Sequence, residues 1–152
     1  MANKFFPVSI DLNDKNILVI GAGKISLRKI ETLLKYNCNI TVITKDILEE
    51  KFFDLEKDDK IKILKYQEFE EKFLENIFLV IAATDNEVLN KNISQLCMSK
   101  NILVNNITSK DDMNVRFASI YEKDDIQIAI SANGNPKKAV EIKHKIKDIF
   151  EK

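Results

Sequence analysis

The residues Asn16-Ile-Leu-Val-Ile-Gly-Ala-Gly-Lys-Ile-Ser26 decide the fold of this chain. Four consecutive apolar residues, Ile17 to Ile20, lead directly into a glycine-rich turn, and helical periodicity follows the turn. A short apolar run bounded by glycine is typical of a buried parallel strand. Gly21 suits a tight turn from strand to helix, and Gly23 allows a phosphate to approach the backbone closely. The stretch therefore predicts a strand–glycine–helix junction that binds the phosphates of a dinucleotide.

Ser26 stands where the dinucleotide-binding fingerprint has its third glycine. A small side chain still lets helix and strand pack closely, so the motif is weakened but not lost. The alternative is an ordinary glycine turn in an α/β protein, but the strand before the turn and the helix after it favour a phosphate site. The residues expected to contact the cofactor here are Gly21, Ala22, Gly23, Lys24 and Ile25.

Length and composition exclude several classes of protein. The chain has 152 residues, which is enough for one domain or for one domain with a small appendage. Its 24 acidic and 24 basic residues balance, and we expect no nucleic-acid partner. No apolar run approaches the roughly 20 residues of a membrane span, and the N-terminus lacks the apolar core of a signal peptide. Cys38 and Cys97 form no metal-binding spacing, so we expect a cytoplasmic protein without a metal site.

Strand-like and helix-like segments alternate from Asn16 to Asn106, which predicts an open parallel sheet of Rossmann-like α/β type. Right-handed crossovers and the glycine turn together predict the strand order 3-2-1-4-5. Strands are expected at residues 16–20, 39–44, 61–66, 77–85 and 102–106. Helices are expected from the glycine turn to residues 36–37, and at residues 47–55, 68–75 and 87–100.

The second strand ends in Thr44, Lys45 and Asp46, at the edge where a Rossmann unit binds the adenosine ribose. An acidic residue at this place would hold the ribose hydroxyls, but Asp46 comes slightly late. Lys45 would tolerate a 2′-phosphate, so the choice between NAD and NADP stays open. We expect these residues to contact the cofactor, with NAD as the cofactor.

Small and polar residues end the next two strands of the predicted sheet. Ala83 and Thr84 leave room for a ligand at the carboxyl end of the fourth strand, although Thr84 and Asp85 would also serve as a helix cap. Asn105 ends the fifth strand, where it would either contact nicotinamide or cap the loop, and we favour contact.

The pattern changes near residue 114. Residues 115–121 and 126–131 predict a β-hairpin, and Pro136 begins a lysine-rich amphipathic helix. A hairpin and one helix cannot form an independent core, so they must pack on the first domain or on a second subunit. We therefore divide the chain into a dinucleotide-binding domain at residues 1–113 and a dimerisation segment at residues 114–152.

Four stretches together are similar to one family: Phe5–Leu12, Gly21–Lys29, Leu79–Asp85 and Ile126–Gly134. On these residues the chain resembles the siroheme synthase N-terminal domain, also called precorrin-2 dehydrogenase. The resemblance implies a Rossmann-like parallel sheet followed by a small hairpin and helix that form a homodimer. It implies NAD-dependent oxidation of the tetrapyrrole precorrin-2 to sirohydrochlorin, and some members of the family also insert ferrous iron.

Two departures from the family affect the expected chemistry. The family usually has a catalytic aspartate just after the fifth strand, and counting along this sequence places Thr108 there. Asp111 or Asp112 would substitute from the same loop, or water would take the proton. The sequence also ends after the last predicted helix, whereas fuller relatives carry a further helical segment. We therefore expect dehydrogenation, with poor iron insertion or none.

A tetrapyrrole with several carboxylates requires cations. The candidates for binding it are Arg28, Arg116, Lys137 and Lys138. His144 is the only histidine, and without a carboxylate cluster we expect a surface residue. Two other functions stay open: a regulatory module that binds NAD without chemistry, and an inactive scaffold subunit of a tetrapyrrole pathway. Turnover of precorrin-2 with NAD separates the enzyme from both.

Overall fold

The structure is a computed structural model that describes residues 3–152. The chain divides into two compact units, the first ending at Val115 and the second beginning at Arg116.

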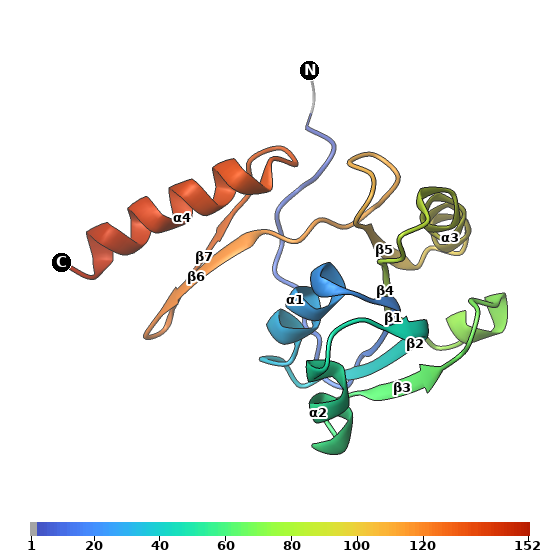
Figure 1. Cartoon of the computed structure of the whole chain (residues 1–152). Coiled ribbons are helices and arrows are strands. Elements are labelled where there is room, and N and C mark those ends of the chain that lie inside the picture. Colours follow the sequence, from blue (N-terminus) through green and yellow to red (C-terminus); the bar gives the residue numbers. More distant parts are fainter. Residues whose placement is uncertain (1–2) are drawn as a thin grey trace. The chain divides into compact units, whose positions relative to one another are not determined.

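The first unit is built on a parallel sheet of five strands in the order β3-β2-β1-β4-β5. The expected Rossmann-like fold and strand order are therefore confirmed (Figure 1). The strands are β1 (Asn16–Ala22), β2 (Asn39–Ile47), β3 (Lys62–Lys65), β4 (Leu79–Ala82) and β5 (Leu103–Asn106). The helices are α1 (Lys24–Leu33), α2 (Lys51–Lys57), the short 3₁₀ helix η1 (Glu71–Leu74) and α3 (Glu87–Ser99).

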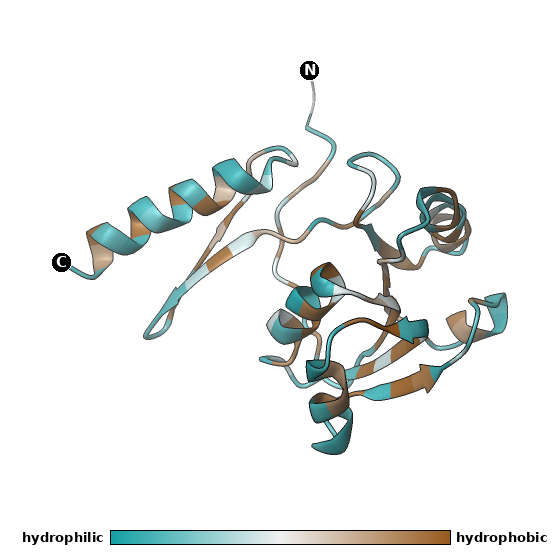
Figure 2. Cartoon of the chain, viewed as in Figure 1, coloured by the Kyte–Doolittle hydropathy of each residue, from teal (hydrophilic) through white to brown (hydrophobic). Residues whose placement is uncertain are grey.

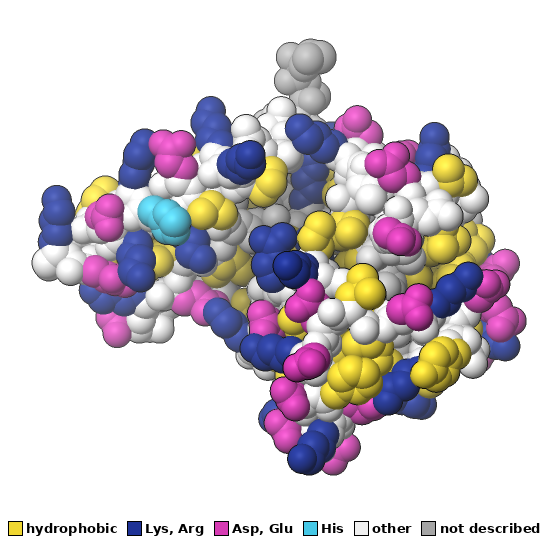
Figure 3. All heavy atoms as spheres, in the orientation of Figure 1, with side chains coloured by type: hydrophobic (Ala, Val, Ile, Leu, Met, Phe, Trp, Pro, Cys, Tyr) yellow, Lys and Arg dark blue, Asp and Glu magenta, His cyan; other side chains and the backbone are white. Residues whose placement is uncertain are grey.

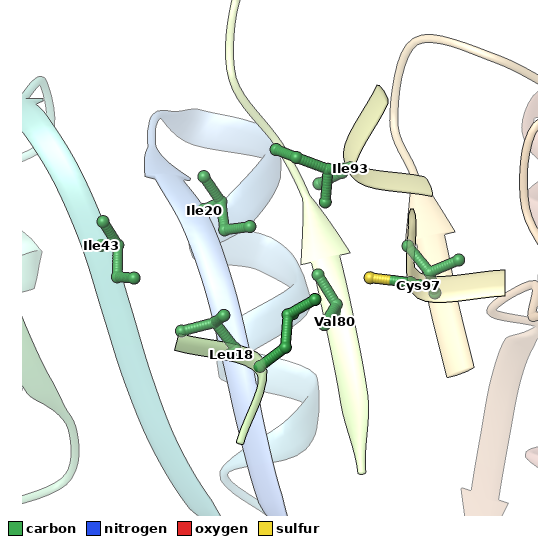
Figure 4. Packing of buried hydrophobic residues seen from close by; sticks show 9 residues of the cluster. Leu18, Ile20, Ile43, Val80, Ile93 and Cys97 are labelled. Atoms are coloured by element: carbon green, nitrogen blue, oxygen red, sulfur yellow. The ribbon is translucent and has the colours of Figure 1, made fainter. Parts of the chain in front are cut away.

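Both faces of the sheet are buried, as the continuous apolar runs in its strands predict. On one face, Leu18 and Val80 from the central strands pack with Ile93 and Cys97 from α3 (Figure 4). On the other face, Ile30 of α1 and Phe52 of α2 are fully buried. The hydrophobic colouring is accordingly concentrated on the strands of this unit and on one side of its helices (Figure 2).

Several segment boundaries differ from those expected from the sequence: the fourth strand spans only Leu79–Ala82, and the helix expected at residues 68–75 is the short 3₁₀ helix Glu71–Leu74. The first helix ends at Leu33 rather than at residues 36–37, because the chain turns back there and Asn39 pairs with Asn16 to begin β2. The second strand continues to Ile47, which pairs with Ala22 across a β-bulge, so a helix from Ile47 was a wrong expectation. The helix α2 begins only at Lys51.

The second unit consists of the antiparallel hairpin β6 (Ser119–Lys123) and β7 (Ile126–Ile130), followed by α4 (Pro136–Phe150). The expected hairpin and helix are confirmed, but β6 begins at Ser119 rather than at residue 115 and continues to Lys123, into the expected turn. The ring of Tyr121 lies 5.9 Å from that of Phe150, which joins the hairpin to the end of α4. Ala139 is the buried residue of α4, whereas 68% of Ile149 is exposed.

The surface carries no single sign of charge on the face shown in Figure 3, where acidic and basic side chains are interspersed. Among the described residues, no helix has both the length and the apolar character needed to cross a membrane.

Candidate functional site

A cleft of about 810 Å³ opens at the carboxyl ends of the strands in the first unit. This is the edge where open parallel sheets bind ligands, at the point where the chain leaves β1 and β4 toward opposite faces. Every residue expected to contact the cofactor lines this cleft, with the exception of Asn105: Gly21, Ala22, Gly23, Lys24, Ile25, Thr44, Lys45, Asp46, Ala83 and Thr84.

The two glycines of the turn differ in what surrounds them. Gly21 has a φ of +108°, and a Cβ added there would lie 2.2 Å from the carbonyl oxygen of Ala83. Only glycine fits this contact between the end of β1 and the end of β4. A Cβ on Gly23 would meet no atom within 4 Å. Gly21 is therefore required by the fold, whereas Gly23 keeps open a space that belongs to the cleft.

The first turn of α1 begins at this open space. Gly23 is its N-cap residue and supplies no side-chain hydrogen bond, and the first turn contains no acidic residue. Ser26, at the third position of the fingerprint, is buried, and its hydroxyl donates to the carbonyl oxygen of Gly23 over 2.9 Å. The backbone N–H groups of Lys24 and Ile25 thus begin a helix whose positive end lacks an internal anion. This arrangement fits a pyrophosphate group.

The ends of β2 and β3 form the opposite side of the cleft. The hydroxyl of Thr44 donates to the backbone oxygen of Asp46. The ammonium of Lys45 lies 2.6 Å from a carboxylate oxygen of Glu68, which also lines the cleft. This hydrogen bond and ion pair raise the pKa of Lys45 and lower that of Glu68. Lys45 therefore already has an anionic partner at this side of the cleft.

A hydrogen-bonded network connects the ends of β4 and β5. Asn90 of α3 is fully buried, and its Oδ1 accepts from the backbone N–H of Thr84 at 3.1 Å. The Nδ2 group of Asn90 donates to Thr108 Oγ1 at 3.2 Å. The hydroxyl of Thr108 in turn lies 2.9 Å from Oδ1 of Asn106. Thr84 and Thr108, which both line the cleft, are held in place by two buried asparagines.

The three candidates for catalysis do not lie together. Thr108 lines the cleft, but Asp111 and Asp112 are not among its lining residues. The carboxylate of Asp112 accepts from the hydroxyl of Ser109 at 3.2 Å. Asp111 is exposed, and its backbone oxygen accepts from Lys4 at 2.6 Å. The structure thus places no substitute carboxylate from this loop in the cleft.

Asn105 is directed away from the cleft. Its side chain is 4% exposed, and its Nδ2 donates to the backbone oxygen of Val115 at 3.1 Å. Successive residues of a strand face opposite sides, so Asn105 and Asn106 cannot both point to the same place. The structure gives Asn105 a role in holding the segment after β5 and does not bring it to the cofactor cleft.

The basic candidates for substrate binding are divided between the two units. Arg28 is exposed on α1 and lies outside the cleft lining. Burial, with the charge of Arg28 as the weaker cause, lowers the pKa of its neighbour Lys29 to about 8. In the second unit, the guanidinium of Arg116 packs over Gly134, where an added Cβ would lie 3.3 Å from Cζ. Lys137 and Lys138 are exposed in the first turn of α4.

The sequence did not predict two features of the cleft: the residues after β3 that line it, and the hydrogen-bonded network around Asn90. Gln67, Glu68 and Phe69 line the cleft because they follow β3, whose carboxyl end lies beside that of β2. The predicted strand order contained this signal, since neighbouring parallel strands end at the same edge. Asn90 gave no such signal, because a polar residue in a helical pattern is ordinarily assigned to the surface.

No group of three or more potential metal-ligating residues was found within residues 3–152. Burial raises the pKa of the Cys97 thiol to about 11, which keeps it in the neutral form in the core.

Comparisons with known proteins identify the family of this chain. The family model described as "Putative NAD(P)-binding" matches residues 8–119. Siroheme synthases of Mannheimia succiniciproducens and Buchnera aphidicola are each 38% identical over 130 residues, which is 86% of this chain and 27% of the relative. A solved structure described as "SirC, precorrin-2 dehydrogenase" is 25% identical, with a TM-score of 0.82 over 95% of this chain and 70% of that one.

The match is therefore spread over most of this chain, whereas the chain spans only 27% of the length of these siroheme synthases. The resemblance to the siroheme synthase family, predicted from four short stretches, is confirmed by these relatives. Because the family model covers the sheet, the glycine turn and the cleft, the chain belongs to this NAD(P)-binding family.

Proposed function

We propose that this chain binds NAD in the cleft of the first unit and oxidises precorrin-2 to sirohydrochlorin. The likeness to proteins named siroheme synthase and to a structure named precorrin-2 dehydrogenase supports the substrate and the reaction. One observation carries the cofactor assignment: the uncapped start of α1 faces an open space at Gly23, within a cleft of about 810 Å³.

The residues of the cleft fit the parts of a dinucleotide. The N–H groups of Lys24 and Ile25 would hold the pyrophosphate, and the ends of β2 and β3 would hold the adenosine ribose. The pairing of Lys45 with Glu68 favours NAD over NADP, because Glu68 offers an acceptor for ribose hydroxyls and opposes a 2′-phosphate. When bound, NAD supplies the hydride acceptor for the oxidation.

The chain's own contribution to the reaction is positioning. The hydroxyl groups of Thr84 and Thr108 are both hydrogen-bonded to Asn90, in the β4–β5 half of the cleft. Thr108 cannot replace a carboxylate base, and the Asp111 and Asp112 side chains do not line the cleft. We propose that water accepts the proton that the substrate loses together with the hydride. The rate acceleration would come from alignment of the reacting carbon with the nicotinamide ring.

The remaining assignments are also proposals. Arg28, Arg116, Lys137 and Lys138 would bind carboxylates of the tetrapyrrole. The second unit has the small core and exposed apolar residues that suit a homodimer, with Ile149 68% exposed, and we propose residues 114–152 as the dimerisation segment. The first domain would then be residues 1–113. We also propose a cytoplasmic location, on the basis of the two widely separated cysteines, Cys38 and Cys97.

A paired spectroscopic assay tests this function. The intact chain is mixed with precorrin-2 and NAD to follow sirohydrochlorin, and ferrous iron is then added to follow siroheme. We expect turnover of precorrin-2 and no acceleration of iron insertion. Position 108 is a threonine rather than an aspartate, and the described residues contain no cluster of three or more potential metal ligands. Binding of NAD without turnover would instead favour the regulatory module, and neither binding nor turnover would favour the inactive scaffold.

A further inference from the structure

The hydrogen bonds around Thr108 determine which atoms donate and which accept. The backbone N–H of Thr108 donates to Oδ1 of Asn106 at 2.9 Å, so this side-chain atom is an acceptor. The hydroxyl of Thr108 lies 2.9 Å from the same atom. Since two acceptors cannot form a hydrogen bond, the hydroxyl must donate its proton to Asn106.

The orientation of Asn90 is determined in the same way. Its Oδ1 accepts from the backbone N–H of Thr84 at 3.1 Å, so its other terminal atom is the amide nitrogen. That nitrogen donates to the backbone oxygen of Thr84 at 3.0 Å and to Oγ1 of Thr108 at 3.2 Å. Backbone groups thus fix both amide orientations.

The hydroxyl of Thr108 therefore has one free position. A threonine hydroxyl has one proton and two lone pairs. Asn106 takes the proton and Asn90 takes one lone pair, and among the described residues no hydrogen bond uses the other lone pair. Because Thr108 lines the cleft, a ligand that bonds to this hydroxyl must supply a donor.

The position in the fold indicates which ligand group this is. Thr108 follows β5, on the side of the glycine turn opposite to β2 and β3. In a dinucleotide-binding fold, the pyrophosphate lies at the turn and the two nucleotides occupy the two halves of the sheet edge. If β2 and β3 take adenosine, the β4–β5 half takes the nicotinamide nucleotide, whose carboxamide has N–H donors.

Resting on the function proposed above, we propose that Thr108 Oγ1 accepts a hydrogen bond from the nicotinamide carboxamide. Asn106 and Asn90 are the positioning residues that keep Thr108 an acceptor. The network thereby requires, in this half of the cleft, a ligand group that donates a hydrogen bond.

Calorimetric titration with three ligands tests the proposal: NAD, its 3-acetylpyridine analogue, which lacks the N–H donor, and ADP-ribose, which lacks the nicotinamide. In the unaltered chain, NAD should bind about fivefold more tightly than the analogue. In Thr108→Val this preference should fall to about one, while the affinity for ADP-ribose stays the same. Thr108→Ser, which keeps the hydroxyl, should retain the preference.

A second pair of variants tests the positioning role. Asn106→Asp keeps the acceptor for the Thr108 proton and should retain the preference for NAD over the analogue. Asn106→Leu removes the acceptor for the hydroxyl proton of Thr108, so Thr108 is no longer held as an acceptor and the preference for NAD over the analogue should fall. Adding Thr108→Val to Asn106→Leu should not lower this preference further. A general loss of folding would lower all three affinities together and leave their ratio unchanged.

The outcomes separate this proposal from the function on which it rests. If the unaltered chain binds neither NAD nor ADP-ribose, the proposed function fails, and this proposal with it. If the chain binds NAD but Thr108→Val keeps the preference, or weakens NAD and the analogue equally, only the role of Thr108 is overturned.

Discussion

Two helices begin at the same cleft, α1 after β1 and α3 after β4, and their first turns are built differently. The N-cap of α3 is Asn86, whose side chain accepts from the backbone N–H of Leu89 at 3.0 Å, and Glu87 adds a negative charge in the first turn. The N-cap of α1 is Gly23, which has no side chain to accept, and no acidic residue follows it closely.

The difference shows how one sheet edge is divided between two tasks. At the start of α3 the chain satisfies its own helix end, and Thr84 and Asn90 complete a polar surface of fixed orientation. At the start of α1 the N–H groups are left to a ligand, and the space above Gly23 is open. An anion is therefore expected at α1, and an uncharged polar group at the β4–β5 half.

The largest expected effect distinguishes the two glycines at the start of α1. Gly21→Val places a side chain against the backbone of Ala83 in a φ region that valine rarely adopts. We expect a loss of roughly 3 kcal/mol or more in the free energy of unfolding, measured by urea denaturation. Gly23→Val adds a side chain where no atom lies within 4 Å and should lower that free energy by only about 1 kcal/mol, the cost of valine at an N-cap. Equal destabilisation by both variants would contradict the division of roles.

A pH effect tests the burial of Cys97 in the core beneath α3. Burial raises the pKa of Cys97 from 9.0 to about 11 in the folded chain. Between these values the unfolded chain loses the thiol proton and the folded chain keeps it, so stability falls as pH rises. The expected loss is about 2 kcal/mol from pH 9 to pH 11, out of about 2.7 kcal/mol for the whole shift in pKa. Cys97→Ala should remove this part of the pH dependence, and an unchanged slope in that variant would contradict the assignment.

The cap of α3 should contribute less. Asn86→Ala removes the acceptor for the N–H of Leu89 and should lower the free energy of unfolding by about 1 kcal/mol, measured by thermal or urea denaturation. Asn86→Asp keeps the acceptor and serves as the matched control, with stability close to that of the unaltered chain. If Asn86→Ala is neutral, α3 does not depend on its own cap and the contrast with α1 is lost.

The smallest effect concerns the choice of cofactor at the β2–β3 side. Glu68→Gln frees Lys45 from its ion pair, so the affinity for NADP relative to NAD should rise by roughly threefold in calorimetric titration. The matched control is Glu71→Gln, which breaks an exposed pair with Lys100 of the same 2.6 Å length outside the cleft lining. A rise of equal size in the control would show that net charge, rather than the Lys45 pair, decides the ratio.

The sequence was sufficient for those parts of the fold that depend on local pattern. Apolar runs, the glycine turn and the alternation of segments predicted the parallel sheet and its order, because each βαβ unit has one favoured hand. The end of β2 was missed because Ile47 belongs to the strand only through its pairing with Ala22, which is distant in the sequence. Tertiary pairing there outweighs the local helical pattern.

The same distinction applies to the site. The residues at the turn and at the ends of β2 and β4 were predicted, because their place follows from the topology. The direction of Asn105 was not, since the sequence alone does not indicate whether a residue at the end of β5 faces the cleft or the segment that follows the strand. The network of Asn90 with Thr108 joins residues that are 18 positions apart, and only the folded chain brings them together.

The most direct test of the central claim converts the start of α1 into a copy of the start of α3. Gly23→Asp supplies the missing cap in an extended backbone (φ −102°, ψ −173°), so stability should stay the same or rise by a few tenths of a kcal/mol. The added carboxylate would occupy the place of the pyrophosphate, and NAD affinity in calorimetric titration should fall by about a hundredfold. Asn86→Asp, which adds the same charge at the other helix start, should have a much smaller effect. Unchanged NAD affinity in a stably folded Gly23→Asp variant would contradict the account.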